Sequence, residues 1–230
     1  MNTENQALLD TPVWAALESK HAHLRLGGTL ARRYHPDVSP FAALASDTPA
    51  AVEELHQLME PGSQVALVTV APLNPSELVR IERAGTIHQM VALPYRGNAP
   101  DRADVLQLGL TDVPEMLELT QKTKPGPFAM RTAEMGNYIG VRHQGRLIAM
   151  AGERMQFGGH VEISAVCVDE DFRGQGLAAR LMNILRQDIE LRGDTPFLHV
   201  FDHNQSAITL YERLGFELRQ VFHLSRLTRD

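Results

Sequence analysis

Apolar residues change their spacing within residues 161–193. Residues 161–168, VEISAVCV, are mostly β-branched or small and show no helical period, which is typical of a strand buried on both faces. After the acidic turn Asp169-Glu170-Asp171, apolar residues recur at helical spacing from Leu177 until Gly193 supplies a stop. The pattern predicts a strand, a turn and a helix. The turn and the helix start carry the run Arg173, Gly174, Gln175, Gly176, Leu177 and Ala178.

Similar patterns predict elements on both sides of this unit. Downstream, we expect a strand at 197–201, a helix at 205–214 with Asn204 as N-cap, and a strand from 216. Upstream, we expect a strand at 105–110, a helix from Thr111 or Asp112 through Lys122, and a hairpin of residues 138–143 and 146–156. Nearer the N-terminus, the predictions are a helix at 12–19, one or two strands within 22–33, a helix at 49–59, a strand at 64–70, a helix at 76–84 and a strand at 86–92. This alternation predicts an α/β fold.

A helix start that carries two glycines is suited to anion binding. Its first N–H groups have no intrahelical partner and lie at the positive end of the helix dipole. Gly174 and Gly176 let the backbone approach a phosphate, and Arg173 adds a charged donor. The expected ligand is a pyrophosphate. The alternative is that this turn only connects the strand to the helix and binds no ligand.

The same letters also fit a dinucleotide-binding pattern. Gly174, Gly176 and Ala179 give G-x-G-x-x-A, and Asp202 follows the next predicted strand, where a ribose-binding acid could lie. That pattern normally opens a doubly wound domain of several strands. Here the remaining chain supplies one further strand, a short helix and a terminal strand, which is too little for such a fold.

Residues 204–216, NQSAITLYERLGF, make another interpretation specific. Together with RGQGLA they resemble the GNAT N-acetyltransferase superfamily, whose signature is Q/R-x-x-G-x-G/A followed by Asn, Tyr and Leu-Gly-Phe. The runs EISAVCV and PFLHV resemble its FR47-like branch, which is related to glycine N-acyltransferases. The resemblance is dense from about Val105 to Val221. It implies a GNAT (acyl-CoA N-acyltransferase) fold, a mixed central sheet flanked by helices, and transfer of acetyl from acetyl-coenzyme A (acetyl-CoA) to a primary amine.

The resemblance also implies which residues hold the coenzyme. The pantetheine arm would pair with the backbone of the strand ending at Val168, whose N–H groups also face the thioester carbonyl. The pyrophosphate would lie on the glycine turn, and the second helix would contribute further contacts. The implied contacts are Val166, Cys167, Val168, Arg173, Gly174, Gln175, Gly176, Leu177, Ala178, Asn204, Ala207 and Tyr211.

Two side chains are candidate catalytic residues. Tyr211 falls on the family's tyrosine position, and a phenol, with a pKa of about 10, can protonate a departing thiolate. The alternative for Tyr211 is packing on a helix face. Glu162 is the candidate general base, because desolvation in an apolar strand raises a carboxyl pKa towards neutrality. Many family members use a water chain instead. The structural alternative for Glu162 is a cross-strand pair with an arginine such as Arg154.

Composition and histidine spacing limit the classes of ligand, the cellular compartment and the metal sites that we expect. A net charge of −6 without a Lys/Arg run argues against general binding to nucleic acid or anionic membranes. The lone Cys167 favours a reducing compartment and is better explained as a core residue than as a nucleophile. No N-terminal signal is recognisable, so we expect a cytoplasmic protein. The pairs His21/His23 and His199/His203 lack a convincing third ligand, and no metal site is expected.

The Pro- and Gly-rich segment 93–101 is typical of a linker and predicts a division of the chain there. We expect a GNAT domain at 99–230 and an N-terminal α/β region at 1–98. The order helix, strand, helix, Gly, strand occurs in both, with Ile81 in the place of Tyr211. Residues 1–98 are therefore either a degenerate copy of the fold without a coenzyme site, or a coincidental arrangement. A non-catalytic CoA-binding module is the alternative function. The acceptor would be a small molecule, for example an amino-acid-like one, or a peptide.

Overall fold

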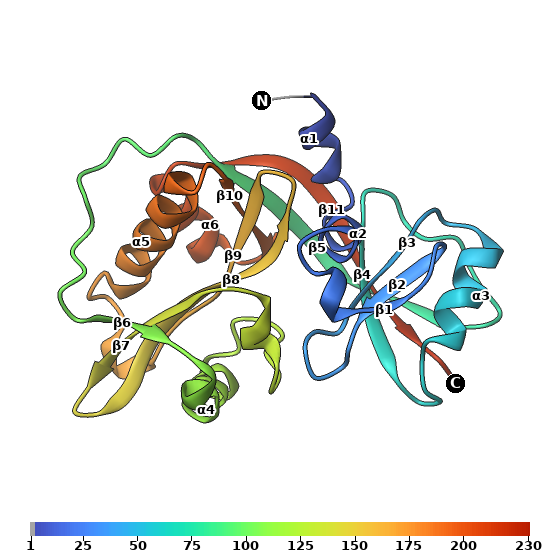
Figure 1. Ribbon diagram of the computed structural model, residues 1–230, viewed down its shortest axis with the longest axis horizontal. Coiled ribbons are helices and arrows are strands. Elements are labelled where there is room, and N and C mark those ends of the chain that lie inside the picture. The colour runs from blue at the N-terminus through green and yellow to red at the C-terminus, as the bar shows by residue number, and fades with distance from the viewer. Residues whose placement is uncertain (1–2) are drawn as a thin grey trace.

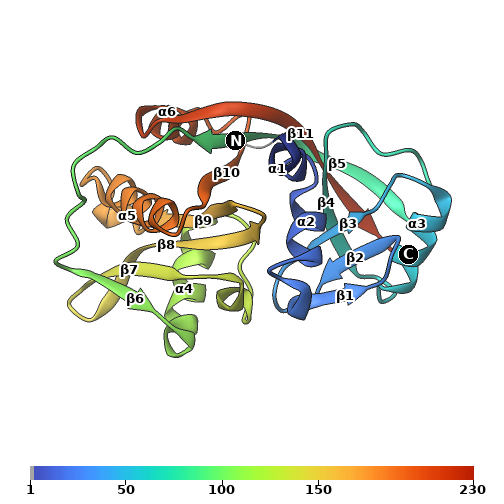
Figure 2. The same cartoon turned by 45° about the horizontal axis from the view of Figure 1, so that its top comes forward.

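A single mixed sheet runs through the whole protein. The computed structural model describes residues 3–230, and within this range eleven strands pair in the order β1-β2-β3-β4-β11-β5-β10-β9-β8-β7-β6. Figure 1 shows two lobes joined by the long strands β5 (Arg80–Ala92) and β11 (Phe216–Thr228). The turned view in Figure 2 shows these two strands arching side by side across the top of both lobes.

The C-terminal lobe contains the strand–turn–helix unit that the sequence predicts. Its strands are β6 (Val105–Leu108), β7 (Tyr138–His143), β8 (Arg146–Phe157), β9 (His160–Val168) and β10 (Thr195–Phe201). Its helices are α4 (Val113–Thr123), α5 (Leu177–Leu191) and α6 (Gln205–Arg213). Short 3₁₀ turns are η2 (Leu110–Asp112), η3 (Thr132–Met135) and η4 (Glu170–Phe172). These bounds confirm the predicted helix at the glycine turn.

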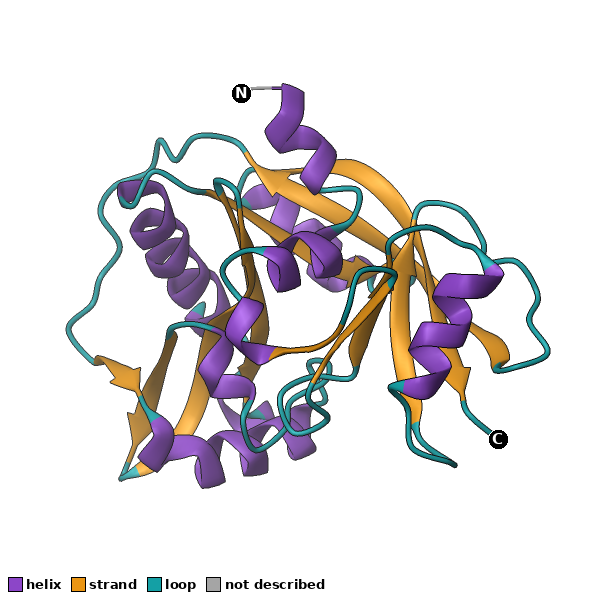
Figure 3. Cartoon of the chain, turned by 45° about the vertical axis from the view of Figure 1, so that its right-hand side comes forward, coloured by secondary structure: helices purple, strands orange, loops and turns teal. Residues whose placement is uncertain are grey.

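The N-terminal lobe is a smaller curved part of the sheet with α3 packed against it (Figure 3). Its strands are β1 (Arg25–Gly27), β2 (Ala31–Tyr34), β3 (Phe41–Leu44) and β4 (Gln64–Thr69). Its helices are α1 (Thr3–Leu8), α2 (Pro12–Glu18), η1 (Ala22–Leu24) and α3 (Pro49–Gln57). The sequence pattern gives no sign of α1 or of β3, which has only four residues.

Separate hydrophobic cores hold the helices and the lobes together. The apolar face of α5 packs on the sheet through Leu181, Leu185 and Ile189, as the helical spacing predicts. A second core joins the lobes, because Leu17 of α2 is in the same buried cluster as Phe197 of β10. The lobes are therefore packed against each other and are not merely connected by chain.

The predicted helix at residues 76–84 is wrong. Residues 80–92 form the single strand β5, which pairs antiparallel with β11 from Thr228↔Arg80 to Phe216↔Ala92. Backbone pairing along the whole strand outweighs a local apolar spacing that also fits a helix. Ile81 therefore lies on a strand, and the proposed correspondence of Ile81 with Tyr211 is wrong.

The two lobes nevertheless have a common strand pattern. In the N-terminal lobe β3 leads through α3 to the parallel strand β4, and in the C-terminal lobe β9 leads through α5 to the parallel strand β10. The strand that follows β10 in the sheet is β5, from the N-terminal half, and the strand beside β4 is β11, from the C-terminal end. The duplication stays a prediction, and any two such copies would have exchanged their last strands.

Candidate active site

A cavity of about 1090 Å³ lies between the two lobes. One wall comes from β9, the start of α5, β10 and α6 of the C-terminal lobe. The other wall comes from β3 and β4 of the N-terminal lobe and from β5 and β11. This volume lies at the upper end of small-ligand sites and suits a long ligand together with a second, smaller one.

Strands β9 and β10 separate along one side of this cavity. They pair only from Thr195↔His160 to Phe197↔Glu162, after which β10 pairs with β5 alone. Ala165, with the left-handed φ of 52°, lies where the pairing of β9 with β8 slips in register. The edge of β9 beyond Glu162 is thus free of a strand partner on the β10 side. Val166, Cys167 and Val168, the predicted pantetheine-binding residues, lie on this segment and line the cavity.

The glycine turn forms an open cradle at the start of α5. Gly174 and Gly176 have φ values of 78° and 77°, and a Cβ added at either would meet nothing within 4 Å. No side chain caps α5, and its first intrahelical bond runs from Arg180 N–H to Gly176 O. The N–H groups of the first turn are therefore available to an anion. The residues present fit a pyrophosphate.

The predicted cradle residues are not all placed alike. Arg173 lines the cavity and donates from Nε to the carbonyl of Val168 at 3.4 Å. Leu177 and Ala178 also line it. Gln175 is exposed and is not among the lining residues. Asp169, at the end of β9, accepts a 2.9 Å bond from Lys122 Nζ, and this bond holds the pKa of the Asp169 carboxyl below its usual value.

Helix α6 places Tyr211 on the same cavity. Asn204 caps this helix, since its Oδ1 accepts from Ala207 N–H at 3.3 Å, and both residues line the cavity. Tyr211 packs at 6.3 Å from the ring of Phe216, and its hydroxyl has no protein partner within residues 3–230. Burial raises the pKa of Tyr211 above its ordinary 10.0. Its phenol therefore keeps its proton at neutral pH and is free to donate it.

Glu162 lies behind the cavity wall and does not line the cavity. It is fully buried and accepts two bonds from Arg154, from Nε at 2.7 Å and from Nη2 at 2.6 Å, and one from His199 Nδ1 at 2.7 Å. Burial alone would raise the pKa of this carboxyl, but the Arg154 charge and hydrogen bonds, with His199, lower it below its usual range. The expected rise in the Glu162 pKa is wrong, and the cross-strand pair with Arg154 is confirmed.

Hydrogen bonds to Gln89 and Glu162 fix the tautomer of His199. Gln89 Oε1 accepts from Arg219 at 2.8 Å, so its Nε2 faces His199 Nε2 at 3.2 Å as a donor. His199 then carries its proton on Nδ1 and donates it to Glu162. Both nitrogens of His21 are likewise engaged, with Tyr34 Oη and Met135 O. Each of these histidines is satisfied by protein groups alone.

Cys167 is chemically quiet although it lines the cavity. Burial raises the pKa of its thiol to about 11, despite a hydrogen bond to Thr123, so little thiolate exists at neutral pH. This agrees with the interpretation of Cys167 as a core residue.

The far wall of the cavity contains residues that the sequence analysis does not single out. They include Phe41 of β3, Ala66 of β4 and Arg226 of β11, which come from three distant segments. Ala66 is the register partner of both Phe41 and Arg226, so the sheet alone brings them together. In the sequence, only the alternation of Arg226 with the apolar Leu227 indicates that the Arg226 side chain faces away from the core, and in the structure Leu227 is buried and Arg226 exposed.

Comparisons with known proteins agree with this geometry. The model of the family described as FR47-like protein matches residues 138–224. A crystal structure assigned to the GNAT family of acetyltransferases, from Novosphingobium aromaticivorans, is 39% identical, covers 96% of this chain and 98% of its own, and superposes with a TM-score of 0.89. The [ribosomal protein bS18]-alanine N-acetyltransferase of Escherichia coli K12 is 30% identical over 118 residues, which are 49% of this chain and 79% of that protein.

A more distant structure shows that both lobes recur together. The GCN5-related N-acetyltransferase from Kribbella flavida is 15% identical, covers 98% of this chain and 96% of its own, and has a TM-score of 0.64. This likeness supports the fold alone. The two relatives that are 30% and 39% identical to this chain, and that it covers over most of their length, show the family as well as the fold. This chain belongs to the GNAT family of N-acetyltransferases, of the FR47-like type, and is an acyl-CoA-dependent N-acyltransferase.

Proposed function

We propose that the protein transfers an acetyl group from acetyl-CoA to a primary amine by direct attack within a ternary complex. The observation that carries this proposal is the meeting of three features on one cavity. These are the uncapped start of α5 with its open glycine turn, the unpaired edge of β9, and the free hydroxyl of Tyr211.

Each of these features has a part in the reaction. Acetyl-CoA supplies an activated thioester when it is bound. The first turn of α5 would bind the pyrophosphate, with Gly174 and Gly176 allowing close approach. The backbone of Val166, Cys167 and Val168 would pair with the pantetheine arm and donate to the carbonyl oxygen as negative charge develops there. Tyr211 would give its proton to the departing sulfur.

Removal of a proton from the acceptor amine is a separate step. Glu162 is turned away from the cavity and is held by Arg154 and His199. We therefore assign Glu162 the role of positioning these two cavity-lining side chains, with water carrying the amine proton away. A carboxylate with a lowered pKa is also a weak base.

The alternative function is a CoA-binding module without turnover. A free phenol on the cavity favours the enzyme, because binding alone does not need a proton donor.

The acceptor is either a small amine or a peptide N-terminus, and the alanine acetylation named for the Escherichia coli relative suggests the latter. We place the reaction in the cytoplasm. Within residues 3–230 no helix is long and apolar enough to cross a membrane.

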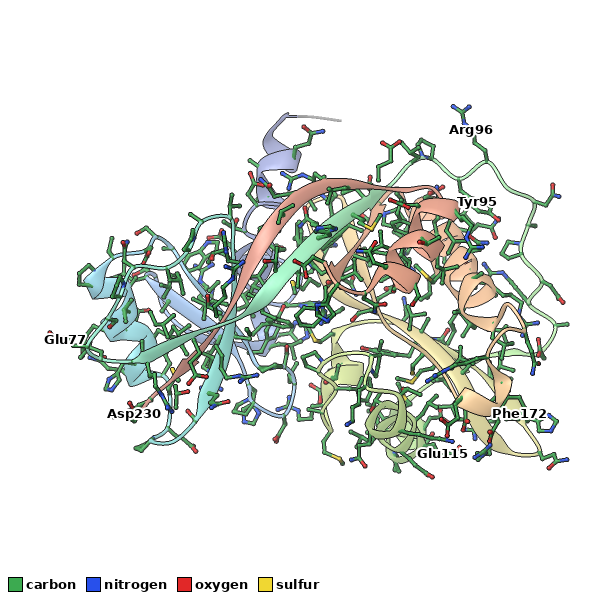
Figure 4. The ribbon with its side chains drawn as sticks, turned by 180° about the vertical axis from the view of Figure 1, so that it is seen from behind. Glu77, Tyr95, Arg96, Glu115, Phe172 and Asp230 are labelled. Atoms are coloured by element: carbon green, nitrogen blue, oxygen red, sulfur yellow. The ribbon has the colours of Figure 1, made fainter. Side chains whose placement is uncertain are left out.

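Replacing Tyr211 by phenylalanine tests the proposal. We expect kcat for acetyl transfer to an amine panel to fall about 100-fold, the usual contribution of a positioned general acid, with the Kd for acetyl-CoA unchanged. Thiol release and calorimetric binding give the two quantities. The matched control is Tyr95→Phe, since Tyr95 lies on the linker outside this cavity (Figure 4). Tight binding of acetyl-CoA by the wild type, without turnover of any amine, would establish the non-catalytic alternative.

A further inference from the structure

The end of the cavity away from the glycine turn has a distinct chemistry. Figure 4 shows Phe172, beside the glycine turn, and Asp230, at the end of β11, on opposite sides of the molecule. Strands β3, β4 and β11 form the wall at the Asp230 side. Across this wall Phe41, Ala66 and Arg226 are register partners in one row, and all three line the cavity. The guanidinium carbon of Arg154 lies 5.0 Å from the centroid of the Phe41 ring.

All charged side chains that line this cavity are basic. They are Lys124, Arg154, Arg173 and Arg226, and within the described residues no aspartate or glutamate lines it. Arg173 lies beside the glycine turn and serves the phosphate end. Arg154 and Arg226 lie at the other end, the acceptor end, where Arg154 is next to Phe41 and Arg226 is the last of the three residues in the row. This chain has a net charge of −6, so a cavity lined by one sign of charge is a local arrangement against the overall balance.

Arg154 has a free donor that is already oriented. Its Nε and Nη2 bind Glu162 side-on, whereas Nη1 has no hydrogen-bond partner within residues 3–230. The residue is 8% exposed and lines the cavity. His199 binds the same carboxylate and so keeps Glu162, and with it the guanidinium, in place. A buried donor of this kind is ready for an oxygen of a ligand at little entropic cost.

Arg226 supplies charge that nothing else neutralises. It is exposed on β11 and forms no ion pair within the described chain. Its cross-strand neighbour is Glu82, but the Glu82 carboxylate lies 3.7 Å from Arg80. The Arg154–Glu162 pair is neutral as a unit, so Arg226 gives the acceptor end its net positive charge. A cationic acceptor such as a polyamine would find no carboxylate there.

We propose that the acceptor is a small amine that also carries a carboxylate, as an α-amino acid does, and that Arg154 Nη1 and Arg226 bind this carboxylate. The inference rests on the proposed acetyl transfer and specifies its acceptor. With the carboxylate held at the far wall, the amino group points back along the cavity towards the thioester and Tyr211. Arg226 is then the residue that selects for charge.

The test compares each of the twenty amino acids with its carboxamide as acceptor. Each pair differs in charge and little in shape. We expect Arg226→Gln to lower kcat/KM for the preferred acids about 10- to 100-fold, the effect of losing one charge-assisted hydrogen bond, and to leave kcat/KM for the carboxamides unchanged. Arg226→Lys should restore part of the difference, because it restores the charge. Arg96→Gln, an exposed arginine of the linker, is the control (Figure 4).

Binding supplies a readout that does not need turnover. In the presence of free CoA, the preferred amino acid should raise the Tm of the wild type and of Arg96→Gln, and should not raise that of Arg226→Gln. Faster transfer to carboxamides or to alanine-initiated peptides than to every free amino acid, or an Arg226→Gln enzyme with unchanged preference, would overturn this inference alone. Absence of transfer to any amine while acetyl-CoA binds would instead refute the proposed acetyl transfer.

Discussion

Glu162 illustrates how partners decide the chemistry of a buried carboxylate. Its strand position and apolar neighbours predict a raised pKa, and only Arg154 and His199, which come from strands on either side, reverse the direction. The sequence pattern offered the pair with Arg154 as an alternative to a catalytic role, but it gave no sign that His199 reaches the same carboxylate. Tyr211, Asn204 and the glycine turn could be predicted, because each belongs to a contiguous motif. Arg226 and Phe41 could not, because only the sheet register brings them to the cavity.

Removing the charge of Glu162 should therefore destabilise the fold. Glu162→Gln leaves Arg154 buried without a counterion, and we expect the free energy of unfolding at pH 7 to fall by about 3–5 kcal/mol in urea titrations. Glu134→Gln, in the more exposed pair with Arg131, is the control and should change stability little. An inactive Glu162→Gln enzyme of unchanged stability would instead support a direct role as base.

The same contact sets a pH dependence. The folded pKa of Glu162 lies below its ordinary 4.5, so its stabilising contribution is complete above that pH and is lost as the pH falls towards the folded pKa. Below pH 4.5 the wild type should lose stability more steeply than Glu162→Gln.

Among the elements, the start of α5 is one whose backbone structure the local sequence predicts. Gly174 and Gly176 both need left-handed backbone, and the helix that follows has a regular apolar face. The segment 76–84 is the opposite case. Its apolar spacing is compatible with a helix, and the long-range pairing of β5 with β11 decides the matter. Local motifs and most strands were therefore predictable, whereas the pairing of strands more than a hundred residues apart, and with it the full length of β5, was not.

A charge placed at the start of α5 should weaken coenzyme binding. For Gly176→Asp we expect the Kd for CoA to rise at least about tenfold, because the carboxylate repels phosphate and competes for the free N–H groups. Gly62→Asp is a closely matched control, since Gly62 has a φ of 76° and, like Gly176, open space around an added Cβ. Calorimetry and thermal shift measure the effect; at a hundred times Kd the ligand should stabilise the control by about 2.7 kcal/mol. Equal affinity of the two variants would move the phosphate site elsewhere.

For the whole molecule, the pairing of β11 with β4 and of β5 with β10 makes each lobe depend on the other. A fragment of residues 99–230 contains β10 and β11 but neither β4 nor β5, so β11 loses both of its neighbours. We expect this fragment to show no cooperative thermal transition by circular dichroism and no stabilisation by CoA. Adding the separate fragment 1–98 is the control for reassembly. A stable, CoA-binding 99–230 fragment would show that the C-terminal half is an autonomous domain.

The position of β11 also orders events during synthesis. It lies between β4 and β5, yet it follows every other strand of the sheet in the chain. Between the end of β5 at Ala92 and the start of β11 at Phe216 the ribosome translates about 120 residues, which takes on the order of ten seconds. Throughout this time β4 exposes the edge that β11 later covers, and β5 lacks β11 and, until that strand is made, β10 as well. Such edges are templates for pairing with other chains. The nascent protein is therefore vulnerable to aggregation until its last strand emerges and inserts.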